Sequence, residues 1–118
     1  MSQYIGEFEQ LILFSILRLG EDAYGVGIRR AIQARSGQDV SAGALYTALG
    51  RLENRGLVTS RVAESAPERS GKRRRYYKLE PAGAAALQRS YSLINRMAEG
   101  LGADLSALAA QAPDGAGD

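Results

Sequence analysis

The sequence predicts a mainly α-helical domain with a small β-hairpin, followed by a C-terminal helix. Three observations predict this fold class. Apolar residues recur at helical spacing three times before residue 57, two β-rich segments flank a polar loop between 57 and 79, and a regular apolar repeat follows Pro81. We therefore expect one domain over residues 1–80, a C-terminal helix over 81–110 and a disordered tail over 111–118.

The composition excludes several classes of function. The chain has 118 residues and is 45% hydrophobic, which suffices for one modest core. It has no cysteine and no histidine, which removes disulfides, most metal sites and histidine-based catalysis. The acidic pairs Glu7/Glu9 and Glu21/Asp22 fall at predicted helix starts, where the helix dipole stabilises them. We expect no enzyme, no metal and no cofactor.

No membrane or export signal is apparent. No apolar run approaches the ~18 residues that a membrane span needs. The first nine residues are acidic rather than basic, unlike the start of a signal peptide. The expected location is the cytoplasm.

Positive charge is concentrated in one part of the chain. The net charge is only +2, yet nine basic residues stand against three acidic ones between Arg51 and Lys78. The remainder has six basic and ten acidic residues. This concentration is typical of a surface that binds a polyanion.

The first two predicted helices are Phe8–Leu19 and Ala23–Ser36. Apolar residues cover nearly the whole circumference of the first, so we expect part of it to meet another subunit. Asp22 is the expected N-cap of the second helix. Gly25 and Gly27 are unusual within a helix and suggest a close crossing near its start.

A third helix is predicted to follow a short turn, which gives a helix-turn-helix arrangement. The Ser41 hydroxyl can cap its first turn, and Gly56 can end it. Leu45, Leu49 and Leu52 recur at i, i+4 and i+7, so they form one buried stripe.

The opposite face of this third helix carries small residues. Two glycines there cost roughly 0.5–1 kcal/mol each relative to alanine. A helix pressed against another surface benefits from them through close approach, whereas the alternative is a poorly formed helix with a solvated face. The face comprises Gly43, Thr47, Gly50 and Asn54, flanked by Tyr46 and Arg51.

A β-hairpin is predicted next, with strands at Leu57–Glu64 and Arg74–Leu79. The loop Ser65–Gly71 contains proline and glycine, and the basic run Lys72–Arg75 at its end cannot be buried at low cost. The residues expected to face inward are Tyr77 and Leu79. Together with the preceding helices, this hairpin predicts a winged helix-turn-helix.

The C-terminal segment shows a heptad pattern after Pro81, which suits the first turn of a helix. Gly100 and Gly102 interrupt the pattern, so the last turns bend or start anew at Asp104. The alternative to helix pairing is an amphipathic helix lying on its own domain. The seam runs through Ala84, Leu87, Tyr91, Ile94, Ala98, Leu101, Leu105 and Leu108, and the residues expected to dimerise are Leu87, Tyr91, Ile94, Ala98 and Leu101.

Three stretches carry a resemblance to a known family: GEFEQLILFSILRLGEDAYGVGIRR, VSAGALYTALGRLENRGLVTSR and SGKRRRYYKLEPAGAAAL. They cover about Gly6–Leu87, and their joint spacing is specific although each alone would be weak. The chain resembles the PadR family of bacterial transcriptional regulators, named for repression of phenolic acid decarboxylase. Two residues depart from the family pattern. Gly50 stands where the family usually has an acidic or polar residue, and Glu80 stands where it usually has threonine before the last helix.

The resemblance implies a homodimeric repressor that binds double-stranded DNA in the bacterial cytoplasm, in association with the nucleoid. In the family, the C-terminal helix dimerises with its twin and with the first helix. The C-terminal region of this chain is short and resembles that of the smaller subfamily with a single terminal helix. The alternative is a winged-helix module for protein–protein or RNA contacts. The residues expected to bind DNA are Ser41, Gly43, Tyr46, Thr47 and Arg51 near the recognition helix, and Lys72, Arg73 and Arg74 on the wing.

The same residues indicate how DNA would be recognised. Thr47 can contact a thymine methyl or a base edge, and Ser41 and Tyr46 can hold phosphates. Because no arginine or asparagine lies centrally on the inserted face, DNA shape and half-site spacing should contribute much of the specificity. Effectors vary within the family and cannot be read from this sequence. Phe14 and Tyr91 are the only aromatic candidates for an effector pocket, and core packing explains them equally well.

Overall fold

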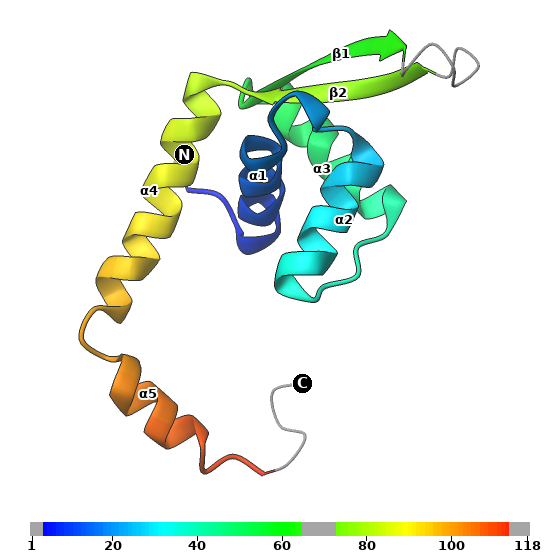
Figure 1. Cartoon of the computed structure of the whole chain (residues 1–118). Coiled ribbons are helices and arrows are strands. Elements are labelled where there is room, and N and C mark those ends of the chain that lie inside the picture. Colours follow the sequence, from blue (N-terminus) through cyan, green and yellow to red (C-terminus); the bar gives the residue numbers. More distant parts are fainter. Residues whose placement is uncertain (1–3, 65–72, 114–118) are drawn as a thin grey trace.

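The computed structural model describes residues 4–64 and 73–113, to which all structural statements here refer. It confirms the predicted fold class: a mainly helical protein with a two-stranded antiparallel hairpin (Figure 1). None of its helices is long and apolar enough to cross a membrane. The elements in order are α1 (Glu7–Leu19), a 3-10 turn η1 (Gly20–Asp22), α2 (Gly25–Ser36), α3 (Ala42–Asn54), β1 (Val58–Glu64), β2 (Arg73–Leu79), α4 (Pro81–Ala98) and α5 (Gly102–Ala109).

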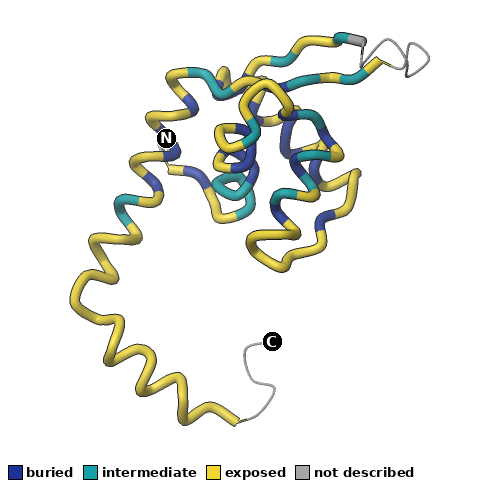
Figure 2. Tube along the Cα trace, in the orientation of Figure 1, coloured by how far each residue is buried: buried dark blue, intermediate teal, exposed yellow. Residues whose placement is uncertain are grey.

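The core lies where α1, α2, α3 and the first half of α4 meet the base of the hairpin (Figure 2). The predicted stripe of α3, Leu45, Leu49 and Leu52, is fully buried. Helix α1 is not buried all round, since Phe14 is 38% and Leu17 62% exposed. Part of α1 therefore remains uncovered within one subunit, as its sequence led us to expect.

The start of α2 differs from the prediction. Asp22 does not cap the helix; it ends the 3-10 turn, and the N-cap position is Tyr24, which makes no side-chain cap. Tyr24 is extended and forms a β-bridge with Tyr76, while the Tyr77 backbone N–H donates to the Ala23 carbonyl at 2.7 Å. Pairing with the hairpin therefore delays the helix by two residues.

Helix α3 begins and ends as predicted. The Ser41 hydroxyl accepts a hydrogen bond from the Ala44 N–H at 3.1 Å, which satisfies one free donor of the first turn. Gly56 has a φ of +75°, the left-handed conformation that glycine adopts without strain.

The hairpin pairs Val58 with Leu79 and Glu64 with Arg73 at its two ends. Tyr77 is buried and Leu79 packs against the core, as predicted. Burial raises the pKa of the Tyr77 phenol above 10.0, so this side chain is neutral at physiological pH. The predicted loop Ser65–Gly71 and the first basic residue, Lys72, lie outside the described residues.

Two glycines permit close contacts between neighbouring elements of the domain. A Cβ at Gly25 would collide with the Tyr46 hydroxyl, which confirms the crossing expected near the start of α2. A Cβ at Gly83 would collide with the Leu57 carbonyl, so α4 can start directly against the base of β1. These contacts fix α3 against α2, and α4 against the hairpin.

The C-terminal segment forms two helices rather than one. Helix α4 contacts α1 and buries Ala86, Leu87 and Ser90, and the Ser90 hydroxyl accepts from the N–H of Ile5, just before α1, at 2.9 Å. Gly100 has a φ of +80°, and the chain then restarts as α5. The second half of α4 and all of α5 project as an exposed arm (Figures 1 and 2). Of the expected tail, residues 114–118 lie outside the described residues.

Candidate nucleic-acid interface

The outer face of α3 is exposed, and two of its four residues are glycines. Gly43, Thr47, Gly50 and Asn54 are all exposed, as the helical phase predicts. A Cβ added at Gly43 or Gly50 would meet nothing within 4 Å. The fold itself therefore requires neither glycine, and close approach by an external surface gives them a reason.

Two polar side chains frame the beginning of this face. The Ser41 hydroxyl already accepts the capping hydrogen bond, but its own proton remains free to donate to an anion. Tyr46 is 48% exposed, and its hydroxyl reaches the backbone of Gly25 at the start of α2. Tyr46 thus bridges α3 and the start of α2, and it leaves half of its surface available to a ligand.

Arg51 and Arg55 lie near the end of α3 and approach one carboxylate of α1. Their guanidinium nitrogens are 4.0 and 3.9 Å from Glu9. The Arg51 side chain is 56% exposed, so this contact is worth at most about 1 kcal/mol. A phosphate could therefore displace it.

The basic residues of the wing divide between the two faces of β2. Arg73 is exposed, whereas the Arg74 guanidinium lies over the Tyr24 ring, 4.3 Å from its centroid. Arg75 donates to the Ser60 hydroxyl at 3.1 Å, and Ser60 donates to Glu53 of α3 at 2.8 Å. Among these arginines, Arg73 is exposed and has no partner in the described part of the chain, while Arg74 and Arg75 tie the wing to the helices.

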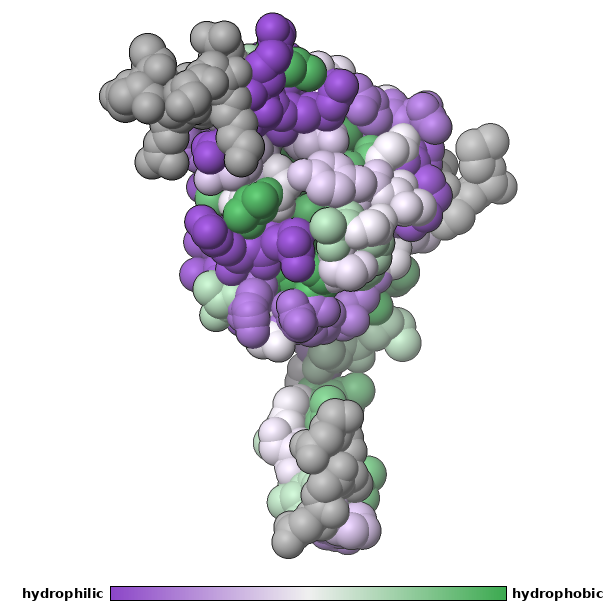
Figure 3. Space-filling view, turned by 90° about the vertical axis from the view of Figure 1, so that its right-hand side faces the viewer, coloured by the Kyte–Doolittle hydropathy of each residue, from purple (hydrophilic) through white to green (hydrophobic). Residues whose placement is uncertain are grey.

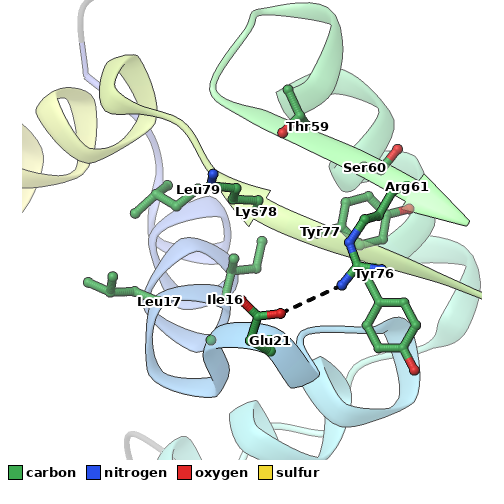
Figure 4. Close-up of a pocket in the computed structure, with 11 residues that line it drawn as sticks. Ile16, Leu17, Glu21, Thr59, Ser60, Arg61, Tyr76, Tyr77, Lys78 and Leu79 are labelled. Atoms are coloured by element: carbon green, nitrogen blue, oxygen red, sulfur yellow. Dashed lines mark ion pairs between the residues drawn. The ribbon is translucent and has the colours of Figure 1, made fainter. Parts of the chain in front are cut away.

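A stack of rings and cations fixes the outer face of the hairpin. The Tyr24 and Tyr76 rings meet edge to face at 5.7 Å, and the Arg61 guanidinium lies 4.9 Å from the Tyr76 centroid. Arg61 also pairs with Glu21 at 3.9 Å across a cleft of about 560 Å³ between the hairpin and η1 (Figure 4). Sequence reasoning missed this stack; the only signal was the alternation of Arg74, Tyr76 and Lys78 on one strand face.

The exposed arm carries an uncovered apolar surface. Ile94 is 60% exposed and Met97 70%, and in Figure 3 the arm is mainly pale or green below the more hydrophilic domain. Leu87, one of the expected dimer residues, is only 3% exposed and belongs to the core of its own subunit, so it lies apart from the exposed surface of the arm. The Phe14 and Tyr91 rings meet edge to face at 5.6 Å. The exposed apolar residues from the second half of α4 to the turn after it, here called the arm surface, are Tyr91, Ile94, Met97, Ala98 and Leu101.

The described residues contain no group of three acidic side chains that could hold a metal ion. They also contain no buried side-chain polar atom that lacks a hydrogen-bond partner. The distinctive features are thus an exposed glycine-bearing helix face, a wing with a free cation and an apolar arm.

This fold is a winged helix-turn-helix, and the model of the PadR-like family of transcriptional regulators matches residues 13–89. The chain belongs to that family, whose members are DNA-binding proteins and not enzymes. No curated protein matches the chain significantly.

Solved structures of the family share the fold. A PadR family transcription regulator from Clostridium difficile is 28% identical, with a TM-score of 0.68 over 85% of this chain and 99% of that one. A PadR-like transcription factor from Bacteroides fragilis is 29% identical, with a TM-score of 0.62 over 78% and 84%. Bacillus subtilis PadR in complex with operator DNA is 23% identical, with a TM-score of 0.59 over 70% of this chain and 46% of that chain, which supports the fold alone.

Proposed function

We propose that this protein is a dimeric transcriptional repressor that binds a pseudo-palindromic operator. Each subunit would place the outer face of α3 in a major groove and Arg73 of the wing against phosphates or an adjacent minor groove. Membership of a family of DNA-binding regulators supports this choice of ligand, and one member of that family, Bacillus subtilis PadR, has been solved in complex with operator DNA. The proposed site residues are Ser41, Gly43, Tyr46, Thr47, Arg51, Lys72, Arg73 and Arg74, and Arg74 also stacks on Tyr24.

The observation that carries the proposal is the open space around Gly43 and Gly50. Helix α3 forgoes roughly 0.5–1 kcal/mol at an interior glycine, and no residue in the described part of the domain uses the space. A groove of DNA would use it, because the helix backbone can then approach the base edges closely. The alternative ligands, another protein or an RNA, remain outcomes of the same experiments.

Gly43→Leu separates DNA contact from folding. The added side chain enters open space in the free protein, so the melting temperature should stay the same or rise. Operator affinity should fall about tenfold or more, since overpacking costs roughly 1–3 kcal/mol. Thermal melts and fluorescence anisotropy measure the two effects, and Ala85→Leu on the exposed face of α4 is the matched control. Unchanged operator affinity in Gly43→Leu would exclude this face from the interface.

Arg73 should supply a salt-dependent and largely sequence-independent part of the affinity. Each lost phosphate contact lowers the slope of log K against log salt by roughly 0.9. Arg73→Ala should flatten the slope by about that amount per subunit and weaken operator and random DNA together. Anisotropy titrations at several salt concentrations measure it, with Arg89→Ala on α4 as the control of equal charge. A slope that matches the unmodified protein would leave the wing as a solvated loop.

The dimer is proposed from the arm surface. Its apolar side chains, together with Phe14 and Leu17 of α1, are too exposed for a stable monomer to present without a partner. A two-fold dimer would cover them and place two copies of α3 on half-sites about 10 bp, or a multiple of that, apart.

A further inference from the structure

We infer that α5 of each subunit docks into a groove between α1 and α2 of a second copy of this chain. The inference rests on the proposed dimer and specifies where the far end of its arm lies. Helix α5 of one subunit would thereby contact α2, the first helix of the partner's helix-turn-helix.

Helix α5 requires a surface to pack against. It has eight residues, none of which is buried, and helices shorter than about 12–15 residues are marginal in water by themselves. Leu105 and Leu108 stand three residues apart, so they share a face, and they are 66% and 67% exposed. The arm holds α5 away from its own domain (Figure 1), so we expect a second copy of the chain to bury its apolar face.

The groove that fits this helix lies between α1 and α2 and has a volume of about 320 Å³. Its lining is apolar along Leu11, Phe14, Ala31 and Ile32, with Arg18 and Arg35 as its charged members. Phe14 also contacts Tyr91 of α4. The groove is therefore continuous with the arm surface that the proposed dimer covers.

Charge distinguishes this groove from the cleft below the hairpin. The chain has no lysine or arginine after Arg96, whereas Glu99 and Asp104 precede and begin α5. Among the described residues, the groove between α1 and α2 is lined by two arginines and by no acidic residue, whereas the cleft in Figure 4 is lined by Arg61 and Lys78 but also by Glu21. An acidic helix with an apolar face therefore fits the groove between α1 and α2 better.

The absence of cysteine makes disulfide cross-linking a direct test. One chain carries Leu105→Cys and a second, differently tagged chain carries Ala31→Cys; the two are co-expressed, purified through both tags and oxidised. We expect a covalent heterodimer on a non-reducing gel in high yield. The matched control pairs Leu105→Cys with Thr59→Cys, which lines the other cleft, and should give little heterodimer.

The outcomes separate this inference from the proposed dimer. If light scattering shows a dimer but residues 105 and 31 do not cross-link between chains, the docking is wrong and the dimer stands. If a chain carrying both cysteines gives only a monomeric disulfide, α5 folds back on its own domain, which also overturns the inference. If the unmodified protein is a monomer, the proposed dimer fails and this inference fails with it.

A charge exchange provides a second readout. Asp104→Arg should weaken dimerisation by roughly two- to fivefold, as expected for an exposed ion pair. Adding Arg35→Glu to the same chain should restore it, whereas adding Arg30→Glu, outside the groove lining, should not. Sedimentation at several concentrations measures the dissociation constants. If Arg35→Glu and Arg30→Glu had equal effects on dimerisation, α5 would not bind specifically in this groove.

Discussion

Ile94→Asp combined with Met97→Asp should convert the protein to a monomer. Both side chains lie on the arm surface and are mostly exposed in one subunit, so two carboxylates there leave the fold intact. A carboxylate buried in the dimer without a partner is strongly disfavoured. Since two linked half-sites raise affinity by 10²–10⁴ over one, operator affinity should fall by about that factor. Light scattering and anisotropy measure the two consequences.

The control for this variant keeps the charge change on the other side of α4. Gln88→Asp combined with Asn95→Asp adds the same two carboxylates at exposed positions that point away from Ile94, so the dimer should persist. Removing the whole C-terminal segment would be a poorer test, because Leu87 and Ser90 belong to the core. A dimer that survives Ile94→Asp with Met97→Asp would place the interface elsewhere.

Leu49→Ala should cost about 2–5 kcal/mol of stability. Leu49 is fully buried within the core cluster, so truncation leaves a cavity that the surrounding helices fill only in part. For a domain of this size the melting temperature should fall by more than about 10 °C. Differential scanning calorimetry or thermal melting by circular dichroism measures it.

Thr47→Ala is the paired comparison on the same helix. Thr47 is exposed, so its removal should change stability by less than about 0.5 kcal/mol while altering operator binding. If Thr47→Ala destabilises the protein more than Leu49→Ala does, α3 is rotated from the orientation described.

Much of the fold could be predicted because local signals agree with tertiary packing. The Ser41 cap, the leucine stripe of α3 and Gly56 are each determined by residues within one or two helical turns. The inward assignment of Tyr77 follows from strand alternation. The residues on the outer face of α3 could be predicted for the same reason. Once the buried leucines are assigned, the helical periodicity determines which residues lie on the opposite face.

The Asp22 cap was wrong, and the surroundings of Leu87 and Arg74 were missed, because these features involve contacts that local sequence does not encode. Asp22 is a good capping residue, but the bridge between Tyr24 and Tyr76 keeps the chain extended past it. Leu87 fits the heptad seam, yet the first half of α4 lies on α1, which buries it. Arg74 belongs to a basic run, and only the position of Tyr24 shows that it stacks on a ring. Each depends on residues brought together from distant parts of the chain.

The central claim is that two copies of α3 bind two half-sites of one operator. The most direct measurement is a footprint of the purified protein on DNA fragments recovered with it, at near-physiological salt. We predict protection of two related half-sites about 10 bp, or a multiple of that, apart, with both lost together in Ile94→Asp combined with Met97→Asp. Protection of a single unpaired site, or binding that does not distinguish these fragments from random DNA, would contradict the account.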